Sequence, residues 1–174
     1  MTLPVAVPVL ETERLRLREW READHGPLAA FYADAAVARF LGAPRDHLEV
    51  WRFLAARAGH WSLRGYGPWA VEEKASGQWV GHCGLWYPHG WPEPELMWSL
   101  APAARGRGYA TEAARRAREF AYQTLGWTTL VSCIVPENIA SQRVAQRLGA
   151  CLERTIELMG HQAGLYRHPG PSQI

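Results

Sequence analysis

The sequence predicts a single α/β domain of mixed α+β character, with a central, mostly antiparallel mixed sheet of about seven strands flanked by about four helices. Three observations support this fold class. The chain has 174 residues, of which 48% are hydrophobic, enough for one domain with a substantial core. Segments with strand and helix periodicity follow one another in the order β-α-α-β-β-β-α-β-α-β-β. Hairpins come first and β-α-β units follow, so we expect a mixed sheet within one domain spanning residues 1–174, with its core at about 11–166.

The first third of the chain predicts one strand and two helices, over residues 12–20, 22–34 and 46–63. In the strand, leucines alternate with arginines, which predicts a half-buried strand with a solvated basic face. The arginines of that face are Arg14, Arg16 and Arg18. Asp46 is a suitable N-cap for the second helix, whose inner face is expected to include Leu48 and Trp51.

The remaining elements begin with a β-hairpin and continue as alternating strands and helices. A turn at residues 75–78 joins the two hairpin strands, and a loop with three prolines follows at 88–94. The longer helix is lined with alanines, and Arg115, Arg116 and Arg118 are expected to point outward from it. The expected strands are 69–74, 79–87, 95–100, 127–135, 151–159 and 164–167, and the expected helices are 109–125 and 138–148.

The composition argues against several classes of function. The formal net charge is +2, from 19 basic and 17 acidic residues, which is too balanced for a protein that mainly coats nucleic acid. No apolar run reaches the ~20 residues of a membrane span, and the N-terminal segment lacks the basic region of a signal peptide. The cysteines, Cys83, Cys133 and Cys151, are odd in number and widely spaced, which favours free thiols over disulfides or a metal site. We therefore expect a cytoplasmic protein with no metal, no nucleic-acid partner and no membrane partner.

Residues 105–111 read Arg-Gly-Arg-Gly-Tyr-Ala-Thr and stand between a predicted strand and the longer predicted helix. Glycines let backbone N–H groups approach a ligand, and a helix N-terminus supplies unpaired N–H groups at the positive end of a dipole. The arginines add positive charge and bidentate donors. This combination predicts a site for a phosphate or pyrophosphate group.

Two common phosphate-binding motifs do not fit this loop. The Walker-type loop requires a Lys-Ser or Lys-Thr pair, which residues 105–111 do not contain. The dinucleotide motif G-x-G-x-x-G needs a third glycine where this chain has Thr111, and it stands early in its β-α-β unit, whereas this loop comes late in the chain. A nucleotide-binding protein is therefore kept only as a third alternative.

The loop instead follows the pattern [Arg/Gln]-x-x-Gly-x-[Gly/Ala], with Ala110 as its small last residue. This pattern resembles the acyl-CoA pyrophosphate loop of the GNAT family of N-acetyltransferases. Residues 136–141, Pro-Glu-Asn-Ile-Ala-Ser, resemble the family's second motif, N-x-x-S. Segments 11–18 and 67–85 are similar to the RimJ/RimL-like branch, which includes ribosomal-protein-alanine acetyltransferases. The resemblance covers about residues 11–166 and implies a GNAT-like fold for the predicted domain.

The resemblance implies direct transfer of an acetyl group from acetyl-CoA to a primary amine within a ternary complex. The acceptor would be a protein N-terminus or a small-molecule amine. Arg107 would lie along the phosphates, and the hydroxyl of Thr111 would either add a phosphate contact or serve as an ordinary capping or exposed group. The backbone of Leu100 would pair with the pantetheine arm. The cofactor-binding residues implied in this way are Leu100, Arg105, Gly106, Arg107, Gly108, Tyr109, Ala110, Thr111, Asn138 and Ser141.

Acetyl transfer requires that the amine lose a proton and that the leaving thiolate be stabilised. Glu95, at the start of a predicted strand, matches a position where the family often carries its base, although a surface charge at a strand edge would give the same pattern. Weaker candidates for the base are Glu72, His82, His89 and Glu93. Residues 141–144 contain no tyrosine that could act as the acid. Asn138 and Ser141 are therefore the candidates near the cofactor sulfur, unless they form only a helix N-cap.

The main alternative is a catalytically degenerate module that binds acyl-CoA as a sensor or scaffold, because the glycines are intact and no acid is assured. If the chain is an enzyme, its acceptor pocket is expected between the two early helices and the hairpin side of the sheet. The possible walls of that pocket are Tyr32, Phe40, Trp51, Trp86 and Trp91. The sequence neither identifies the acceptor nor decides between a monomer and a homodimer.

Overall fold

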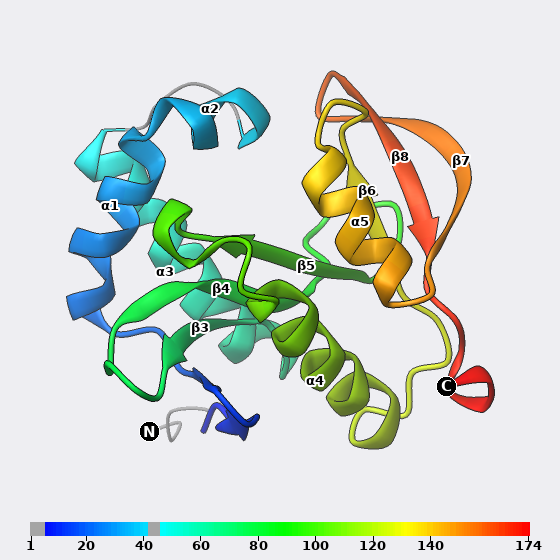
Figure 1. Cartoon of the computed structure of the whole chain (residues 1–174), viewed down its shortest axis with the longest axis horizontal. Coiled ribbons are helices and arrows are strands. Elements are labelled where there is room, and N and C mark those ends of the chain that lie inside the picture. Colours follow the sequence, from blue (N-terminus) through cyan, green and yellow to red (C-terminus); the bar gives the residue numbers. More distant parts are fainter. Residues whose placement is uncertain (1–5, 42–45) are drawn as a thin grey trace.

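The structure is a computed structural model that describes residues 6–41 and 46–174. Within these residues, five α-helices and one sheet of eight strands follow one another along the chain (Figure 1). The strands are β1 Leu10–Glu11, β2 Leu15–Arg18, β3 Pro68–Glu73, β4 Trp79–Trp86, β5 Glu95–Leu100, β6 Val131–Ile134, β7 Cys151–Leu158 and β8 His161–Arg167. The helices are α1 His25–Ala33, α2 Ala35–Leu41, α3 His47–Arg64, α4 Tyr109–Gln123 and α5 Ile139–Arg147. The arrangement confirms the predicted α/β fold class, with one more strand and one more helix than expected.

The two additional elements are short. β1 has two residues, and α2 follows α1 directly, in a segment for which the sequence predicted no helix. The chain turns at Asp34, whose backbone is extended (φ −73°, ψ 125°). The Oδ1 atom of Asp34 accepts a hydrogen bond from the N–H of Ala36 at 2.8 Å, so the residue that ends α1 also caps α2. Because α2 buries only Val37, it has no apolar period that would reveal it in the sequence.

The sheet has the strand order β1-β2-β3-β4-β5-β6-β8-β7, and β5–β6 is its parallel pair. These two strands are paired at one position, where Glu95 lies opposite Val131. Beyond that position they diverge (Figure 1). β5 leads to α4 and β6 leads to α5, so each diverging strand is followed by the N-terminus of a helix.

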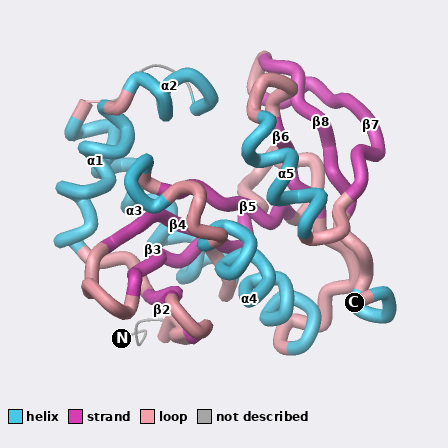
Figure 2. The backbone as a smooth tube through the Cα atoms, viewed as in Figure 1, coloured by secondary structure: helices cyan, strands magenta, loops and turns pink. Residues whose placement is uncertain are grey.

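The apolar core is divided between the two faces of the sheet. On β3, Trp69 and Val71 pack in the cluster that contains the alanines of α4, whereas Ala70 packs with residues of α1 and α3. Alternate residues of a strand point to opposite faces, so α4 covers one face and α1 and α3 cover the other (Figure 2). Ala113 and Ala117 are fully buried, which allows α4 to lie close to β4 and β5.

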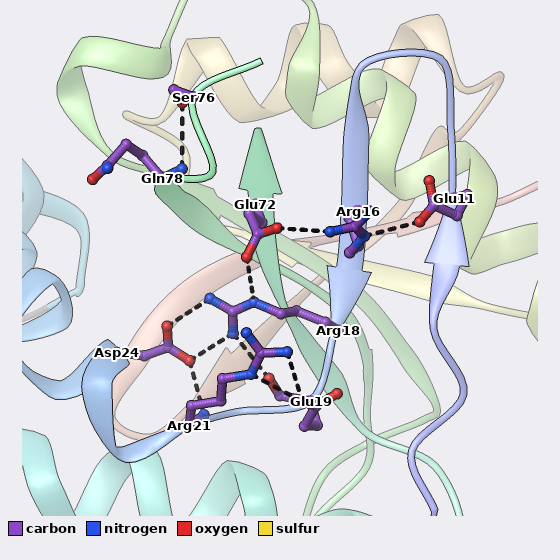
Figure 3. A network of polar contacts seen from close by, with 9 residues as sticks. All are labelled: Glu11, Arg16, Arg18, Glu19, Arg21, Asp24, Glu72, Ser76 and Gln78. Carbon is purple, nitrogen blue, oxygen red and sulfur yellow. Dashed lines mark hydrogen bonds and ion pairs between the residues drawn. The ribbon is translucent and has the colours of Figure 1, made fainter. Parts of the chain in front are cut away.

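Arg18 is buried and does not belong to a solvated basic face, contrary to the sequence prediction (Figure 3). Its guanidinium donates to both carboxylate oxygens of Asp24, at 2.8 and 2.9 Å. Its Nε atom donates to Glu72 at 2.8 Å. The prediction failed because the 3-10 turn Glu22–Asp24 brings a buried carboxylate onto β2, and strand periodicity cannot reveal such a partner. A buried charge must be paired, and this network joins β2, β3 and the start of α1.

The inner face of α3 also differs from the prediction. Leu48 and Trp51 are 57% and 51% exposed. The buried residues of the helix are Val50, Leu54, Arg57, His60 and Trp61. These positions form a helical stripe that includes the predicted Leu54 but excludes Leu48 and Trp51. Trp51 is therefore half exposed and does not belong to the apolar core, and its role as a wall of an acceptor pocket stays a prediction.

Arg118 in α4 is 6% exposed, although helical spacing predicted an outward position. Its Nη1 atom donates to the carbonyl of Leu148 at 2.5 Å. Leu148 is the C-cap residue of α5, where carbonyl groups lack partners within the helix and a nearby cation is favourable. The contact ties α4 to the end of α5.

Among the residues that the structure describes, no helix is both long and apolar enough to cross a bilayer. No group of three or more His, Cys, Asp or Glu side chains in residues 6–41 and 46–174 is placed to hold a metal ion. Cys83, Cys133 and Cys151 are free thiols, as their spacing predicted.

Candidate active site

The loop before α4 exposes backbone donors at the start of the helix. Gly106 and Gly108 have φ values of 76° and 81°, in the left-handed region that favours glycine. Gly108 is the N-cap of α4 and provides no side-chain cap. The N–H of Glu112 makes the first helical bond, to the carbonyl of Gly108 at 3.1 Å. The N–H groups of Tyr109, Ala110 and Thr111 precede that bond, so they are available to an anion.

Thr111 supports the same interpretation. Its Oγ1 atom is buried and has no hydrogen-bond partner within the described part of the chain. It lies at a surface hollow of about 510 Å³. Buried hydroxyl groups are normally paired, so this orphan fits a phosphate oxygen at the helix N-terminus. The hollow is lined by Glu13, Arg14, Gly106, Gly108, Thr111, Glu112, Arg115 and Arg147.

The arginines of this hollow are not the ones that the sequence singled out. Arg107, expected along the phosphates, instead forms an ion pair with Glu73 at 2.7 Å and lies over the ring of Tyr109. Arg115 and Arg147 take its place in the hollow. Arg115 follows Thr111 by one helical turn, which helical spacing could have shown, whereas Arg147 comes from the end of α5 and gives no local signal. A phosphate contact by Arg107 stays a prediction that requires its ion pair to open.

Arg14 lies at the boundary between the hollow and the N-terminal strands. Its side chain forms an ion pair with Glu112 at 2.6 Å and donates to the carbonyl of Arg107 at 2.9 Å. Glu112 also accepts a hydrogen bond from the hydroxyl of Thr12 at 2.6 Å. These contacts fix the glycine loop against the segment before β2.

The edge of β5 that faces β6 presents backbone groups for pairing. The N–H of Ala101 donates to the carbonyl of Val80 at 2.9 Å, so every second residue of this segment bonds toward β4. The groups of Trp98 and Leu100 therefore point toward β6, which pairs with β5 only at its start. The carbonyl of Leu100 accepts a hydrogen bond from Nε of Arg105 at 3.2 Å. This edge is where an extended ligand with amide groups could add to the sheet.

The ladder between β5 and β6 ends at a strand junction formed by Glu95, Leu96, Ser132 and Cys133. In a continued parallel ladder, the N–H of Cys133 would donate to the carbonyl of Leu96. Instead, the N–H of Cys133 donates to Oε1 of Glu95 at 2.9 Å. The carbonyl of Leu96 accepts from the hydroxyl of Ser132 at 2.6 Å. Each strand thus caps a group that the other leaves unpaired, so the strands separate without orphaned backbone groups at this position.

His168 supports the strand junction from its buried side. Its Nε2 atom lies 2.9 Å from Oγ of Ser132. Since the single hydroxyl hydrogen of Ser132 goes to Leu96, the imidazole is the donor in this contact. Burial, and then the charge of Arg118, lowers the pKa of His168 to about 3, so the ring stays neutral at physiological pH.

Glu95 has the environment expected of a general base. The residue is 7% exposed, and its Oε2 atom accepts a hydrogen bond from Nε1 of Trp91 at 2.7 Å. Burial raises the pKa of Glu95 to about 7, against the opposing effects of the Cys133 N–H and Trp91. A base whose pKa lies near the working pH combines the correct protonation state with adequate basicity. The alternative, an exposed charge at a strand edge, is therefore wrong for Glu95.

The other carboxylates considered as bases are neutralised by arginines. Glu93 pairs with Arg167 and, at 3.0 Å, with Arg154, and the hydrogen bond from Arg167 is the main cause that lowers its pKa. Glu72 is held by Arg18 at 2.8 Å. Both carboxylates therefore join structural elements, and the lowered pKa of Glu93 makes it poorly suited to accept a proton.

The two histidine candidates differ in burial. His82 is completely buried on β4, and burial, followed by the charge of Arg57, lowers its pKa well below the ordinary value. Such a ring stays neutral and does not titrate near pH 7. His89 is exposed in the loop between β4 and β5. Neither histidine lies at the strand junction as Glu95 does.

Asn138 and Ser141 form the N-terminus of α5. The Oδ1 atom of Asn138 accepts a hydrogen bond from the N–H of Ser141 at 3.1 Å, which confirms the N-cap interpretation. The cap does not use the hydroxyl of Ser141, and the residue is partly exposed. A role for either residue at the cofactor sulfur stays a prediction.

Comparison with known proteins agrees with this geometry. Residues 14–150 match the family described as the Acetyltransferase (GNAT) domain. The chain is similar to an acetyltransferase from Agrobacterium tumefaciens str. C58, with 32% identity and a TM-score of 0.85. That similarity covers 97% of this chain and 98% of the other.

Two further relatives extend the comparison. YkkB, an uncharacterized Bacillus subtilis protein, is 28% identical over 166 residues, which cover 90% of this chain and 93% of YkkB. The fold is also that of RimL, a ribosomal L7/L12 alpha-N-protein acetyltransferase solved in complex with coenzyme A. RimL is 17% identical, with a TM-score of 0.78 over 93% of this chain and 98% of its own. The chain belongs to the GNAT family of N-acetyltransferases, enzymes that take their acetyl group from acetyl-CoA.

Proposed function

We propose that this enzyme transfers the acetyl group of acetyl-CoA to a primary amine by direct attack within a ternary complex, with Glu95 as the general base. The observation that carries the proposal is the placement of Glu95. Its buried carboxylate, with a pKa raised to about 7 by burial, lies where β5 and β6 separate. A neutral amine must lose a proton as it attacks a thioester and forms an amide, and a carboxylate with this pKa can take that proton near neutral pH.

The same geometry suggests how acetyl-CoA would be held. The pyrophosphate would accept hydrogen bonds from the N–H groups at the start of α4 and from Thr111. Arg115 and Arg147 would supply positive charge at the hollow. The amides of the pantetheine arm would pair with the free edge of β5 at Trp98 and Leu100, which directs the thioester toward the strand junction.

In the proposed reaction, the neutral amine nitrogen attacks the carbonyl carbon of the thioester while Glu95 receives the proton from nitrogen. The tetrahedral intermediate collapses, the carbon–sulfur bond breaks, and the thiolate of coenzyme A leaves. Ser141, held in the first turn of α5 by the Asn138 cap, is the proposed hydroxyl donor to that thiolate. Positioning both reactants in one complex supplies much of the rate acceleration.

We propose a peptide N-terminus as the first acceptor to test. RimL, which shares this fold, is a ribosomal L7/L12 alpha-N-protein acetyltransferase. A small-molecule amine is the second acceptor class. The free thiols of the chain agree with an enzyme of the reducing cytoplasm.

The competing hypothesis is a degenerate module that binds acyl-CoA without catalysis. The decisive experiment incubates the protein with acetyl-CoA and a panel of peptides and small amines, and follows the release of free thiol. Amine-dependent thiol release supports the proposed function. Tight binding of coenzyme A with no thiol release across the panel would support the degenerate module. Glu95→Gln serves as the variant for the base.

A further inference from the structure

The loop between β4 and β5 brings the indole of Trp91 against the carboxylate of Glu95. The Nε1 atom of Trp91 donates to Oε2 at 2.7 Å. The other carboxylate oxygen, Oε1, accepts from the N–H of Cys133 at 2.9 Å. Two donors from different parts of the fold therefore determine the orientation of the carboxylate.

The loop is fixed at its first residue. The N–H of Tyr87 donates to Nε2 of His60 at 3.3 Å. Because Nε2 accepts this bond, the proton of the neutral ring is on Nδ1, which donates to the carbonyl of Tyr66 at 2.7 Å. The ring of His60 also stacks on Trp86, with centroids 4.8 Å apart. The side of α3 thus holds the end of β4 from which the loop departs.

The loop is fixed again two residues after Trp91. Glu93 forms ion pairs with Arg167 of β8 and Arg154 of β7. Glu153 of β7 contacts Arg167 at 2.7 Å and continues the cluster. Networks of charges hold their geometry better than isolated surface pairs do.

The backbone of the loop is itself restricted. Pro88, Pro92 and Pro94 limit its φ angles, and the N–H of Trp91 donates to the carbonyl of Pro88 at 3.2 Å. Gly90, with φ 81°, takes the left-handed position that this turn requires. A segment anchored at both ends and stiffened between them is suited to hold one side chain in one place.

We infer that Trp91 is a positioning residue that orients the Glu95 carboxylate and stabilises its charged form through the indole N–H. This inference rests on the proposed role of Glu95 as the base. The β4–β5 loop, anchored by Glu93, would then tune the base through Trp91. Loss of the indole N–H removes a hydrogen bond to a charged group, and such bonds are stronger than neutral ones.

The ionisable groups around Glu95 and its loop come from several elements. The thiol of Cys133 on β6 has its pKa raised to about 12 by burial and then by Glu95 and Glu93. The other ionisable groups in the loop or in contact with it are Tyr87, His89, Glu93, Arg64 and His60 on α3, Arg154 on β7 and Arg167 on β8. His168 contacts Ser132 at the strand junction, and its pKa is lowered to about 3. On β4, the residue opposite Glu95 is Trp86, which does not titrate.

The test is Trp91→Phe, which keeps an aromatic ring and removes the N–H. We expect the midpoint of the acid limb of the kcat–pH profile to rise by about one pH unit, with the KM for acetyl-CoA changed less than about twofold. The profile is measured at saturating acetyl-CoA with the peptide or amine that gives the fastest thiol release. An acid limb that keeps its midpoint would overturn the inference.

Two further variants make the result specific. Trp20→Phe makes the same chemical change at an indole whose N–H donates to the carbonyl of Pro68 at 2.9 Å, and it should leave the midpoint in place. In a Glu95→Gln background, Trp91→Phe should cause no additional change in the pH profile. Full activity of Glu95→Gln would contradict the proposed base itself, whereas a slow Glu95→Gln with an unshifted Trp91→Phe would contradict only the role of Trp91.

If Trp91→Phe fails to fold, Glu93→Asp provides the same test with the indole intact. This variant keeps the negative charge near Glu95 but shortens the side chain that anchors the loop on β7 and β8. We expect its acid limb to move in the same direction as that of Trp91→Phe. An unchanged midpoint in a folded Glu93→Asp protein would equally overturn the inference, and circular dichroism establishes the fold of each variant.

Discussion

The carboxylate of Glu95 accepts a hydrogen bond from the backbone N–H of Cys133 at 2.9 Å, across the point where β5 and β6 separate. A single side chain thus replaces a rung of the ladder and occupies the position proposed for the base. The burial that this requires raises the pKa of the carboxyl to about 7. The same carboxylate therefore ends the pairing of β5 and β6 and is the proposed base of the reaction.

Replacement of Glu95 by Gln should lower kcat by about 10²-fold or more, since general bases contribute about 10² to 10⁴ in rate. The affinity for coenzyme A should change little, because the residue lies at the strand junction and not at the glycine loop. Rates of thiol release and calorimetric binding of coenzyme A measure the two quantities separately. A variant that loses affinity and rate in parallel would argue for a binding role instead.

The pH dependence of stability should also report on Glu95. Its pKa is raised from 4.5 to about 7 on folding, so folding favours the protonated form. The stabilising effect of that proton is complete below about pH 4.5 and is lost as the pH rises through about 7. The wild-type protein should therefore lose up to about 3 kcal/mol relative to Glu95→Gln between pH 4.5 and pH 8.5. Urea unfolding of both proteins across this range tests the sign, and a constant difference would contradict the raised pKa.

Thr111→Val should separate ligand affinity from stability. The buried hydroxyl has no partner in the described residues, so replacing it by a methyl group should leave the free energy of unfolding unchanged or raise it. Affinity for coenzyme A should fall by about tenfold or more if the hydroxyl contacts phosphate. Isothermal titration and thermal unfolding of the same samples supply both readings. Unchanged affinity would show that the hydroxyl faces no phosphate, and Thr124→Val, beyond the other end of α4, is the matched control.

Replacement of Met159 by asparagine should stabilise the protein, because Met159 occupies a left-handed turn position. It lies in the two-residue turn between β7 and β8, with φ 51° and 80% exposure. A left-handed backbone costs a residue other than glycine about 1–2 kcal/mol, and asparagine tolerates it better. Met159→Asn should therefore stabilise the protein by about 0.5–1 kcal/mol without changing the rate of thiol release. A lower midpoint of thermal unfolding would count against this account of the turn.

The order of helices and strands was predictable because most of them bury apolar residues that recur with the period of that element. The hairpin of β3 and β4 and the alanine-lined α4 occur where periodicity placed them. The segment 127–135 was predicted as one strand, but β6 covers only Val131–Ile134. The expected last strand begins at His161 instead of 164, because β8 continues its pairing with β7 to the turn. The ends of a strand depend on which neighbouring strand it pairs with, and residue propensities do not identify that strand.

The parts of the candidate site that are formed by consecutive residues were predictable. The glycine loop and the Asn138 cap each lie within a few residues, and the structure places both at helix N-termini. The partners of charged residues were not predictable, since Arg18 and Arg118 are buried by contacts with distant segments. The same holds for Trp91, whose relation to Glu95 requires the anchored loop to fold back on the strand.

The junction of β5 and β6 divides the sheet into two parts that share one backbone rung, one built from β1 to β5 and the other from β6 to β8. In the proposed complex, acetyl-CoA lies between these parts and takes the place of a strand that the polypeptide does not provide. Each catalytic cycle then completes the sheet and takes it apart again. In that complex, bound acetyl-CoA would join the two parts of the sheet more firmly than their single backbone rung does.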